Sequence, residues 1–545
     1  MNEINKALEK IKLDYLAPGV RALILSCMNF IESLSKTIKD LTSEIQILKD
    51  ENNRLKGEQG KPSIRANTKD KDISSEKERK AREEKTPKKK RSKAKNHKLV
   101  IHRTERIPID KSTLPSDAKF TGLRRVIVQD ILISPNNVLF ECEEYYSASE
   151  KKVFSSSVPP GYEGQFGPNI KALIKTLHHD SKMTLEIIVS FFKTFGTMIA
   201  KSTVSLFLTT NVEEEEKESK EIVEAGLISV PFKQLDDTGA RVKGKSWFTH
   251  ILCNSLFTSF HTRPHKNRLT VIEILTQKPL TFLLNDLSYT LMIKMKIPEK
   301  AITWLKDQKK EESLTESQFD GLLEEFYPSS QKNQQAQKNI KDAAAIAAYR
   351  EHAHSLNILL TDDAPQFKAI TKWLALCWIH EGRPYKKLSP ILDLYKKYTD
   401  TFLKDFWDYY RSLLAYKESP TPKKAKKLSK EFDVLFSRKT GYQELDDRAA
   451  LTKAQKENLL LVLQFPDLPL HNNASELAAR EQARRRDISF HTMSLKGTVA
   501  KDAFMTIVAT AKKHNVNVYD YFLDRITKTY EMTSLADLIL QKSSP

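Results

Sequence analysis

The segment Leu235-Asp236-Asp237-Thr238 carries two carboxylates beside a short apolar run and is predicted to lie on a β-strand. Two later segments have the same character: Thr361-Asp362-Asp363-Ala364-Pro365 and Asn472-Asn473-Ala474-Ser475-Glu476. Carboxylates are costly to bury, so beside buried segments they usually need a counter-charge such as a divalent cation. The three segments together therefore predict a metal site that is split along the chain.

The surroundings of each acid predict the element that carries it. After Asp236, the apolar runs 246–252 and 269–275 predict two further strands, giving a β-meander that begins with an acid, as ribonuclease-H-like nuclease cores do. Asp362 follows the short apolar run 356–360, which predicts a buried strand with the acid just past its end. Glu476 lies one turn into a predicted helix, with Asn472 or Asn473 as N-cap.

Basic residues lie near the second and third acids. The apolar run 373–378 ends shortly before His380 and Arg383, and Arg480 follows Glu476 by four residues, on the same helix face. These three side chains could contact DNA phosphates, or they could simply neutralise the acidic cluster.

Composition bounds the class of protein. The 545 residues, 40% of them apolar, are enough for about three domains with real cores. The net charge of +19 points to a polyanionic partner, nucleic acid above all, because Lys and Arg release counterions from phosphates. No apolar run of about 18 residues and no signal-peptide pattern occurs, so we expect a cytoplasmic protein with no membrane partner. The four cysteines form no Cys-x-x-Cys pair and predict reduced thiols.

Residues 1–57 predict a helix with a coiled-coil seam. The leucines recur every seven residues, and isoleucines with one asparagine fill the alternate seam positions: Leu34, Leu41, Leu48, Leu55 and Ile31, Ile38, Ile45, Asn52. Isoleucine and leucine in this arrangement favour a parallel dimer, whose register a seam asparagine would fix. The alternative is an amphipathic helix packed on its own chain.

Residues 58–98 predict a disordered basic linker. Between Lys61 and Lys98 there are 16 Lys and Arg against 6 Asp and Glu, with no aromatic residue. Such a segment cannot form a core. Its densest part, Lys88-Lys89-Lys90-Arg91, is predicted to hold DNA phosphates without reading sequence, although a merely solubilising linker is the alternative.

Two small regions follow the linker. Residues 99–160 predict a small β module, with strands at 123–131 and 138–142 on either side of a turn. Residues 161–225 predict a helical region that includes a helix-turn-helix broken at Phe195-Gly196, whose second helix would present Ser202 and Thr203 to a DNA groove. Helix pairs joined by a glycine turn are common, so an ordinary packed pair remains the alternative.

Several motifs resemble, in order and spacing, the DDE transposases of the insertion-sequence-66 family. They are Asp236-Asp-Thr-Gly, Leu360-Thr-Asp362-Asp-Ala-Pro, Leu376-Cys-Trp-Ile-His380-Glu-Gly-Arg383 and His471-Asn-Asn-Ala-Ser-Glu476-Leu-Ala-Ala-Arg480. The zipper, the basic linker, Val158-Pro-Pro-Gly161, the helix-turn-helix and the tail from Ile507 to Leu523 are also similar. The resemblance covers most of the chain.

The resemblance implies a multidomain α+β protein: an N-terminal coiled coil, a helix-turn-helix region and a ribonuclease-H-like α/β catalytic core over residues 226–500. Asp236, Asp362 and Glu476 would hold two Mg²⁺ or Mn²⁺ ions for phosphoryl transfer on DNA. Asp237 and Asp363 are adjacent alternatives. Since neighbouring strand residues point to opposite faces, one acid of each pair should be the ligand, and the resemblance favours the first. Residues 501–545 would form a C-terminal helical region.

The chain departs from the family in two ways. Only Cys142 lies where many relatives carry zinc-binding cysteine pairs, so the zinc module is expected to be absent. The spacings of 126 residues from Asp236 to Asp362 and 114 from Asp362 to Glu476 predict helical insertions near 287–350 and 386–464. The second is rich in aromatic residues at helical spacing, which favours a packed core over a base-stacking platform.

These features predict a transposase that cuts and joins double-stranded DNA ends as a homodimer. We expect a bacterial, nucleoid-associated protein, with small accessory proteins as further partners. The alternatives are a DNA-binding protein with vestigial acids and a nuclease acting on RNA–DNA hybrids. The latter would leave the zipper, linker and helix-turn-helix unexplained.

Overall fold

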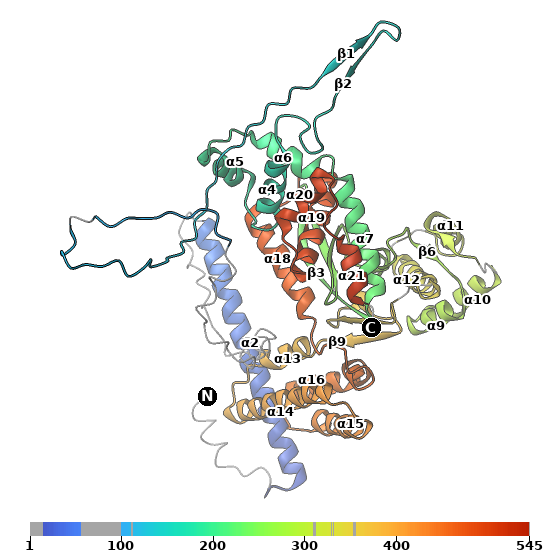
Figure 1. The fold of residues 1–545 in the computed structure, drawn as a ribbon. Coiled ribbons are helices and arrows are strands. Elements are labelled where there is room, and N and C mark those ends of the chain that lie inside the picture. Colours follow the sequence, from blue (N-terminus) through green and yellow to red (C-terminus); the bar gives the residue numbers. More distant parts are fainter. Residues whose placement is uncertain are drawn as a thin grey trace.

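The computed structural model describes residues 15–55, 100–110, 113–308, 312–328, 330, 332–352 and 356–543, and it is a mixed α/β protein (Figure 1). The basic linker, with Lys88, Lys89, Lys90 and Arg91, lies outside these residues. None of the helices in the described parts of the chain is both long and apolar enough to cross a membrane.

A five-stranded mixed sheet forms the centre of the molecule, in the order β5-β4-β3-β8-β9. Its strands are β3 (Phe232–Val242), β4 (Lys245–Cys253), β5 (Thr258–Arg263), β8 (Ile358–Thr361) and β9 (Trp373–Leu376). The first three pair antiparallel, whereas β8 and β9 run parallel to β3. Lys243 and Gly244 both have positive φ, 49° and 74°, as the two-residue turn that joins β3 to β4 requires.

The third strand of the antiparallel part was predicted in the wrong place. Residues 269–275 belong to helix α8 (Arg268–Thr276), and β5 is the third strand. The Asn267 side chain accepts a hydrogen bond from the Thr270 backbone N–H at 2.9 Å and so caps the start of α8. A short run of Val, Ile and Leu fits a buried helix as well as a strand, and this cap decides between them.

Helices cover both faces of the sheet. On one face, Ile251 and Phe260 pack against α18 (Asn473–Ser489) and α19 (Leu495–Lys513). Leu235 and Leu252 belong to the largest apolar core, which includes residues from α7 (Glu213–Ser229), α8, the C-terminal helices α20 (Val518–Thr527) and α21 (Leu535–Ser543), and the first insertion. These two apolar cores therefore hold the helices against the two faces of the sheet.

The predicted β module at 99–160 is wrong for most of its length. No residue between 113 and 143 is in a strand, and the runs 123–131 and 138–142 are extended chain with exposed apolar side chains. Only a short hairpin forms, β1 (Glu144–Ser147) with β2 (Lys152–Ser155). Two strands with no second layer have no core in which to bury their apolar face. Figure 1 shows the hairpin projecting from the body of the molecule.

The predicted helix-turn-helix region contains three short helices, α4 (Pro168–His179), α5 (Leu185–Thr194) and α6 (Lys201–Thr209). Ile174, Ile188, Phe192 and Val204 form a small core of their own. Gly196 in the turn between α5 and α6 has a φ of 80°, which a side chain would disfavour. DNA contact by this region remains a prediction.

Two helical insertions leave the sheet, close to the predicted positions. The first contains β6 (Thr281–Phe282), α9 (Asp286–Lys294), α10 (Glu299–Asp307), β7 (Leu314–Thr315), α11 (Glu316–Phe326) and α12 (Gln334–Glu351). The second contains α13 (Trp378–Lys387), α14 (Asp393–Glu418), α15 (Pro422–Ser437), α16 (Gln443–Ala454) and α17 (Lys456–Leu459). The aromatic residues of α14 are buried, including Tyr395, Phe402 and Phe406, so the prediction that they form a core is confirmed.

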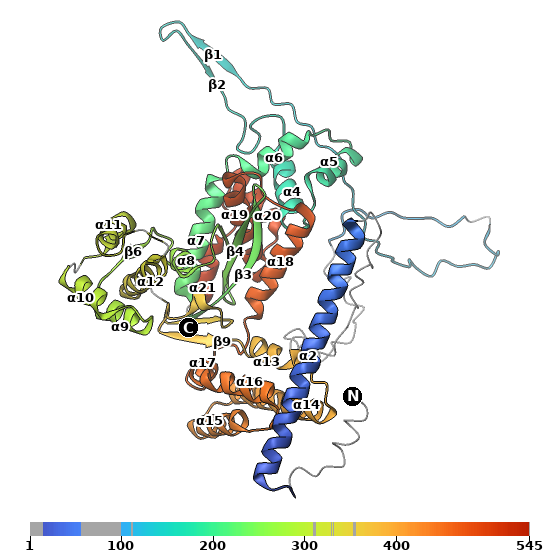
Figure 2. The same ribbon diagram turned by 180° about the vertical axis from the view of Figure 1, so that it is seen from behind.

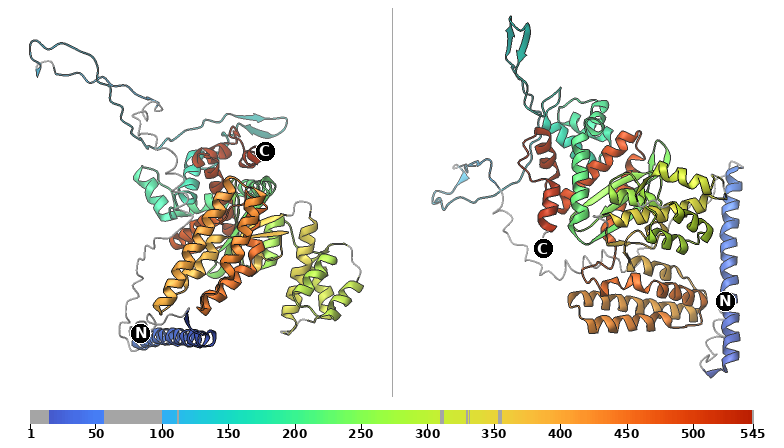
Figure 3. Two further views of the ribbon diagram at one scale, coloured as in Figure 1. Left: turned by 90° about the horizontal axis from the view of Figure 1, so that it is seen from below. Right: turned by 90° about the vertical axis from the view of Figure 1, so that its right-hand side faces the viewer.

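The N-terminal helix α2 (Pro18–Leu55) packs with its first half against the second insertion (Figure 3). Met28 is buried there, and the Glu32 carboxylate accepts hydrogen bonds from the backbone N–H groups of Ile391 and Leu392, just before α14 begins. A carboxylate at a helix N-terminus is favourable. Leu34, Leu41 and Leu48 of the predicted seam are exposed, and the Leu55 side chain lies outside the described residues. The homodimer therefore remains a prediction.

Two helical glycines give a matched test of this packing. A Cβ at Gly226 in α7 would lie 2.6 Å from ring carbons of the buried Phe257, whereas one at Gly321 in α11 would meet nothing within 4 Å. We expect Gly226→Ala to lower the free energy of unfolding by about 2 kcal/mol, because the clash outweighs the gain in helix propensity. Gly321→Ala should raise it by about 0.5–1 kcal/mol. Thermal melting of both variants measures the effect, and equal shifts would contradict the packing of α7 on Phe257.

Candidate functional site

Parallel pairing between β3 and β8 brings the first two predicted acids together. Gln234 pairs with Leu360, and Asp236 and Asp362 each lie two residues further along their strands. Residues two apart on a strand share a face, so both carboxylates lie at the same level and on the same side of neighbouring strands. The strand register alone produces this alignment, since the two residues are 126 positions apart in the chain.

Helix α18 carries the third acid to the same face. The Gln482 side chain donates to Thr249 Oγ1 on β4 at 3.0 Å, and Arg486 Nη1 donates to the backbone oxygen of Gly239 on β3 at 2.8 Å. These contacts hold the helix across the face to which Asp236 points. Asn472 is the N-cap residue, as one of the two predicted alternatives, and Glu476 is in the first turn.

The electrostatics of Asp236 reflect this convergence. Burial, together with the negative charges of Asp362, Asp237 and Glu476, raises the pKa of the Asp236 carboxyl to about 7. Glu476 is compensated differently: both of its oxygens lie 3.1 Å from Arg383 Nη2, and Arg480 and His380 approach at 3.3 and 3.4 Å. Of the three predicted acids, only Glu476 therefore pairs with cations among the described residues.

The second acid of each pair has its own partners. Asp237 accepts from Lys266 Nζ at 3.2 Å and from Gln366 Nε2 at 2.8 Å, and Asp363 lies 3.0 Å from Lys368 Nζ. Among the residues that the structure describes, no cationic side chain pairs with Asp236 or Asp362. Of each pair, the first acid is therefore the one left to meet a cation from solution.

Lys266 and Gln366 were not predicted from the sequence. Gln366 follows the Asp-Ala-Pro motif directly, so its position beside the acids was a usable signal. Lys266 lies in the turn after β5, where only the correct third strand would have placed it near Asp237.

The donor set fits a hard divalent cation. Two uncompensated carboxylates and Glu476 offer oxygen ligands, which Mg²⁺ prefers. Within the described residues, however, the one group of three possible ligand residues whose atoms all lie within 4.8 Å of one another is Cys377, His380 and Glu476, without Asp236 or Asp362. Burial raises the pKa of the Cys377 thiol to about 12, so this sulfur is protonated when no metal is bound. Asp236, Asp362 and Glu476 offer the harder, all-oxygen donor set, but their oxygens lie further apart than the atoms of this group.

The remaining predicted DNA contacts lie in two places. His380, Arg383 and Arg480 surround Glu476, an arrangement that can neutralise its charge. Arg383 and Arg480 also keep much of their side-chain surface exposed. Ser202 is exposed at the start of α6. Thr203 instead lines a groove and is a weaker candidate for a phosphate contact.

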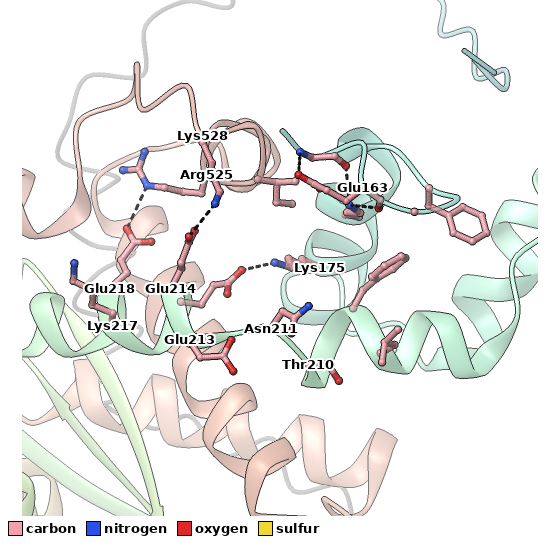
Figure 4. A pocket seen from close by; sticks show the side chains of 18 of the residues that line it. Glu163, Lys175, Thr210, Asn211, Glu213, Glu214, Lys217, Glu218, Arg525 and Lys528 are labelled. Carbon is pink, nitrogen blue, oxygen red and sulfur yellow. Dashed lines mark hydrogen bonds and ion pairs between the residues drawn. The ribbon is translucent and has the colours of Figure 1, made fainter. Parts of the chain in front are cut away.

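That groove, of about 1020 Å³, lies between α4, α6, α7 and the segment after α20 (Figure 4). Its glutamates are paired with bases: Glu215 with Lys175, Glu214 with Lys528 at 3.5 Å, and Glu218 with Arg525 at 3.9 Å. It contains none of the three converging acids. Because its charges are mutually satisfied, it offers no evident chemistry, and the carboxylate cluster remains the candidate site.

Comparison with known proteins places the chain in a family without adding a function. No family model matches it. It is 30% identical over 308 residues to the uncharacterized protein y4jO of Sinorhizobium fredii (strain NBRC 101917 / NGR234), an alignment that covers 56% of this chain and 94% of that protein. The chain belongs to the same family as that protein.

The raised pKa of Asp236 predicts a pH-dependent stability. The pKa moves from 3.8 to about 7 on folding, so the stabilising contribution of this group is complete below pH 4 and is lost as the pH rises through 7. In the presence of a chelator at pH 8, Asp236→Asn should therefore be more stable than the unchanged protein, by up to roughly 4 kcal/mol at about 1.4 kcal/mol per pKa unit. The difference should shrink at pH 5.

Asp363→Asn is the control for this measurement, because Asp363 is exposed and paired with Lys368. Its effect on denaturant-induced unfolding should stay within about 0.5 kcal/mol. A loss of stability in Asp236→Asn at pH 8 would show that Asp236 is not held in a repulsive, buried cluster.

Proposed function

We propose that this member of the y4jO family is a DNA transposase of the DDE type, which cleaves transposon ends and joins them to target DNA with divalent metal ions. The observation that carries the proposal is the convergence of Asp236, Asp362 and Glu476 from two parallel strands and a helix packed across them. These are the three acids that the resemblance to the insertion-sequence-66 family singled out.

The sheet supports a ribonuclease-H-like core. Three antiparallel strands are followed by two parallel ones, and the first acid lies on the long strand β3 in the middle of the sheet. Helices on both faces complete an α/β layer structure. Ligand sites in such sheets lie beyond the carboxyl ends of parallel strands, where Asp362 lies.

Asp236, Asp362 and Glu476 would hold the two Mg²⁺ or Mn²⁺ ions. Bound there, the ions would supply activation of a water or 3′-hydroxyl and stabilisation of the leaving oxygen. The chain's own residues would position the ligands. Gln482 and Arg486 hold α18 on the sheet. The hydrogen bonds that Asp237 accepts from Lys266 and Gln366 hold the strand beside Asp236. Arg383 and Arg480 orient Glu476 and leave donors exposed for a DNA phosphate.

Binding of double-stranded DNA is supported by charge and by exposed bases. The chain has a net charge of +19. The exposed lysines of α15, Lys423, Lys426 and Lys430 among them, add to the basic linker and the helix-turn-helix as places where phosphates could bind. The exposed leucines of α2 support a homodimer formed by a second copy of that helix.

Cleavage of labelled DNA tests the proposal. The substrate is a duplex taken from the DNA that flanks the gene, at any inverted repeats found there, incubated with millimolar Mg²⁺. We expect cleavage and strand transfer, with losses of more than about a hundredfold in Asp236→Asn, Asp362→Asn and Glu476→Gln, since each removes a ligand. Asp363→Asn, whose side chain pairs with Lys368 instead, should keep most of the activity.

DNA binding separates the outcomes of this experiment. End binding with no cleavage by the unchanged protein would identify a DNA-binding protein with vestigial acids. Cleavage of RNA–DNA hybrids alone would identify a different ribonuclease-H-like nuclease.

Metal binding has a readout that needs no DNA. We expect Mg²⁺ at about ten times its dissociation constant to stabilise the protein by about 1.4 kcal/mol, because the ion binds the folded cluster only. Chelation should reverse the effect, Asp362→Asn should abolish it, and Asp363→Asn should preserve it. Equal stabilisation of all three proteins would place the ion elsewhere.

A further inference from the structure

The segment that follows α18 is fastened to the far end of the β3–β4 hairpin. The Phe490 backbone N–H donates to Arg486 O at 2.8 Å, and the Phe490 backbone has a φ of 53°. Beyond it, Lys243 N donates to Thr492 O at 2.8 Å and Thr492 N donates to Arg241 O at 3.3 Å. The backbone on both sides of Phe490 is thus held by the rest of the fold.

The side chains of this fastened segment are nevertheless in solvent. Phe490 is 72% exposed and Met493 is 74% exposed, and Leu495 at the start of α19 is also exposed. A positive φ is a genuine outlier for a bulky residue and persists only where the surroundings impose it. A projecting apolar group on a fixed backbone is suited to contact with another molecule.

Basic side chains without an ion pair in the described parts of the chain lie on the elements that meet beside Phe490 and Met493. Arg241, Lys243 and Lys245 at the hairpin end and Arg484 on α18 are exposed, and no ion pair is found for them among the described residues. Asp487 is the one nearby acid on the exposed face of α18 within the described chain. The surface is therefore positive around an aromatic centre, which is complementary to a nucleic acid rather than to a lipid interior or an apolar protein face.

This surface is continuous with the candidate active site. Arg480 and Arg484 lie on one exposed face of α18, which runs between Glu476 and Phe490 (Figure 2). Fourteen residues of helix correspond to roughly 21 Å. Seven residues of β3, from Asp236 to Lys243, give a similar separation of roughly 23 Å. A duplex crossing both places would span about six base pairs.

We propose that this surface, formed by Arg241, Lys243, Lys245, Arg484, Phe490 and Met493, binds duplex DNA about six base pairs from the cleaved phosphate and that Phe490 stacks on a base displaced from the helix there. The inference rests on the proposed function, because it takes DNA as the substrate of the carboxylate cluster. Apolar side chains inserted at a base step unstack it, and the cost is lowest where the base is already mispaired.

A binding measurement that needs no transposon sequence tests the proposal. Two probes of about 30 base pairs, roughly three helical turns, carry 2-aminopurine at the centre, either paired with thymine or mispaired. The unchanged full-length protein should bind the mispaired probe about tenfold more tightly and quench its fluorescence through stacking. Phe490→Ala should lose both the preference and the quenching.

The phosphate contacts are tested separately. The double variant Lys243→Gln, Lys245→Gln should weaken binding of both probes equally. It should also lower the slope of log affinity against log salt by about 1.8, or about 0.9 for each phosphate that the lysines no longer neutralise. An unchanged slope would overturn the assignment of these lysines.

Tyr530→Ala is the matched control. Tyr530 is an aromatic residue at a positive φ of 50° and is 57% exposed, but it lines the glutamate-rich groove. It should keep the preference for the mispaired probe, and melting should show both variants folded. Retained preference in Phe490→Ala would overturn the proposal, as would a change of oligomeric state in that variant with unchanged DNA binding, which would identify a contact between copies.

Failure of this inference is distinguishable from failure of the proposed function. A protein that cleaves DNA with Mg²⁺ but whose Phe490→Ala variant behaves normally has the proposed activity without the stacking interaction. A protein that prefers the mispaired probe through Phe490 yet never cleaves DNA keeps this surface and loses the transposase assignment.

Discussion

The parallel pairing of β3 with β8 is the constraint on which the rest of the site depends. It aligns Gln234 with Leu360 and so sets Asp236 level with Asp362, although the two lie in different parts of the chain. A shift of the register by one residue would turn one of the two acids to the opposite face. Gln482 and Arg486 then fix α18 on the same strands, which makes the position of Glu476 a consequence of the sheet.

The two faces of the sheet divide the charges near the site. On one face Asp237 meets Lys266 and Gln366, and its charge is compensated within the protein. On the other, Asp236 and Asp362 are both partly buried, neither pairs with a cation among the described residues, and the pKa of Asp236 rises. The fold thus tolerates repulsion at one place while stabilising the neighbouring positions, a pattern that is common at functional sites.

The second insertion supports the site, although it lies outside the sheet. Its aromatic core holds α13, where a Cβ at Gly382 would lie 2.8 Å from Trp407, and the Glu381 carboxylate bonds to Arg448 and Thr452. Helix α13 in turn carries His380 and Arg383 to Glu476. Because α2 caps α14 through Glu32, the N-terminal helix is joined to the same unit. Packing remote from the acids therefore decides how Glu476 is compensated.

Local pattern was enough to predict strands β3, β4 and β8, the helix that bears Glu476, both insertions and the aromatic core of the second. It was insufficient where a single capping residue, or the lack of a strand partner, determines the structure of an apolar run. The run 269–275 became a helix through its cap at Asn267, and the apolar runs at 123–131 and 138–142 found no strand partners among the described residues. The resemblance favoured Asp236 over Asp237, but only the tertiary structure revealed the partners of Asp237, and only it gathered Arg241, Lys243 and Phe490 at one end of the hairpin. Periodicity reports which face of an element is apolar, whereas compensation of a charge depends on which elements meet across the sheet.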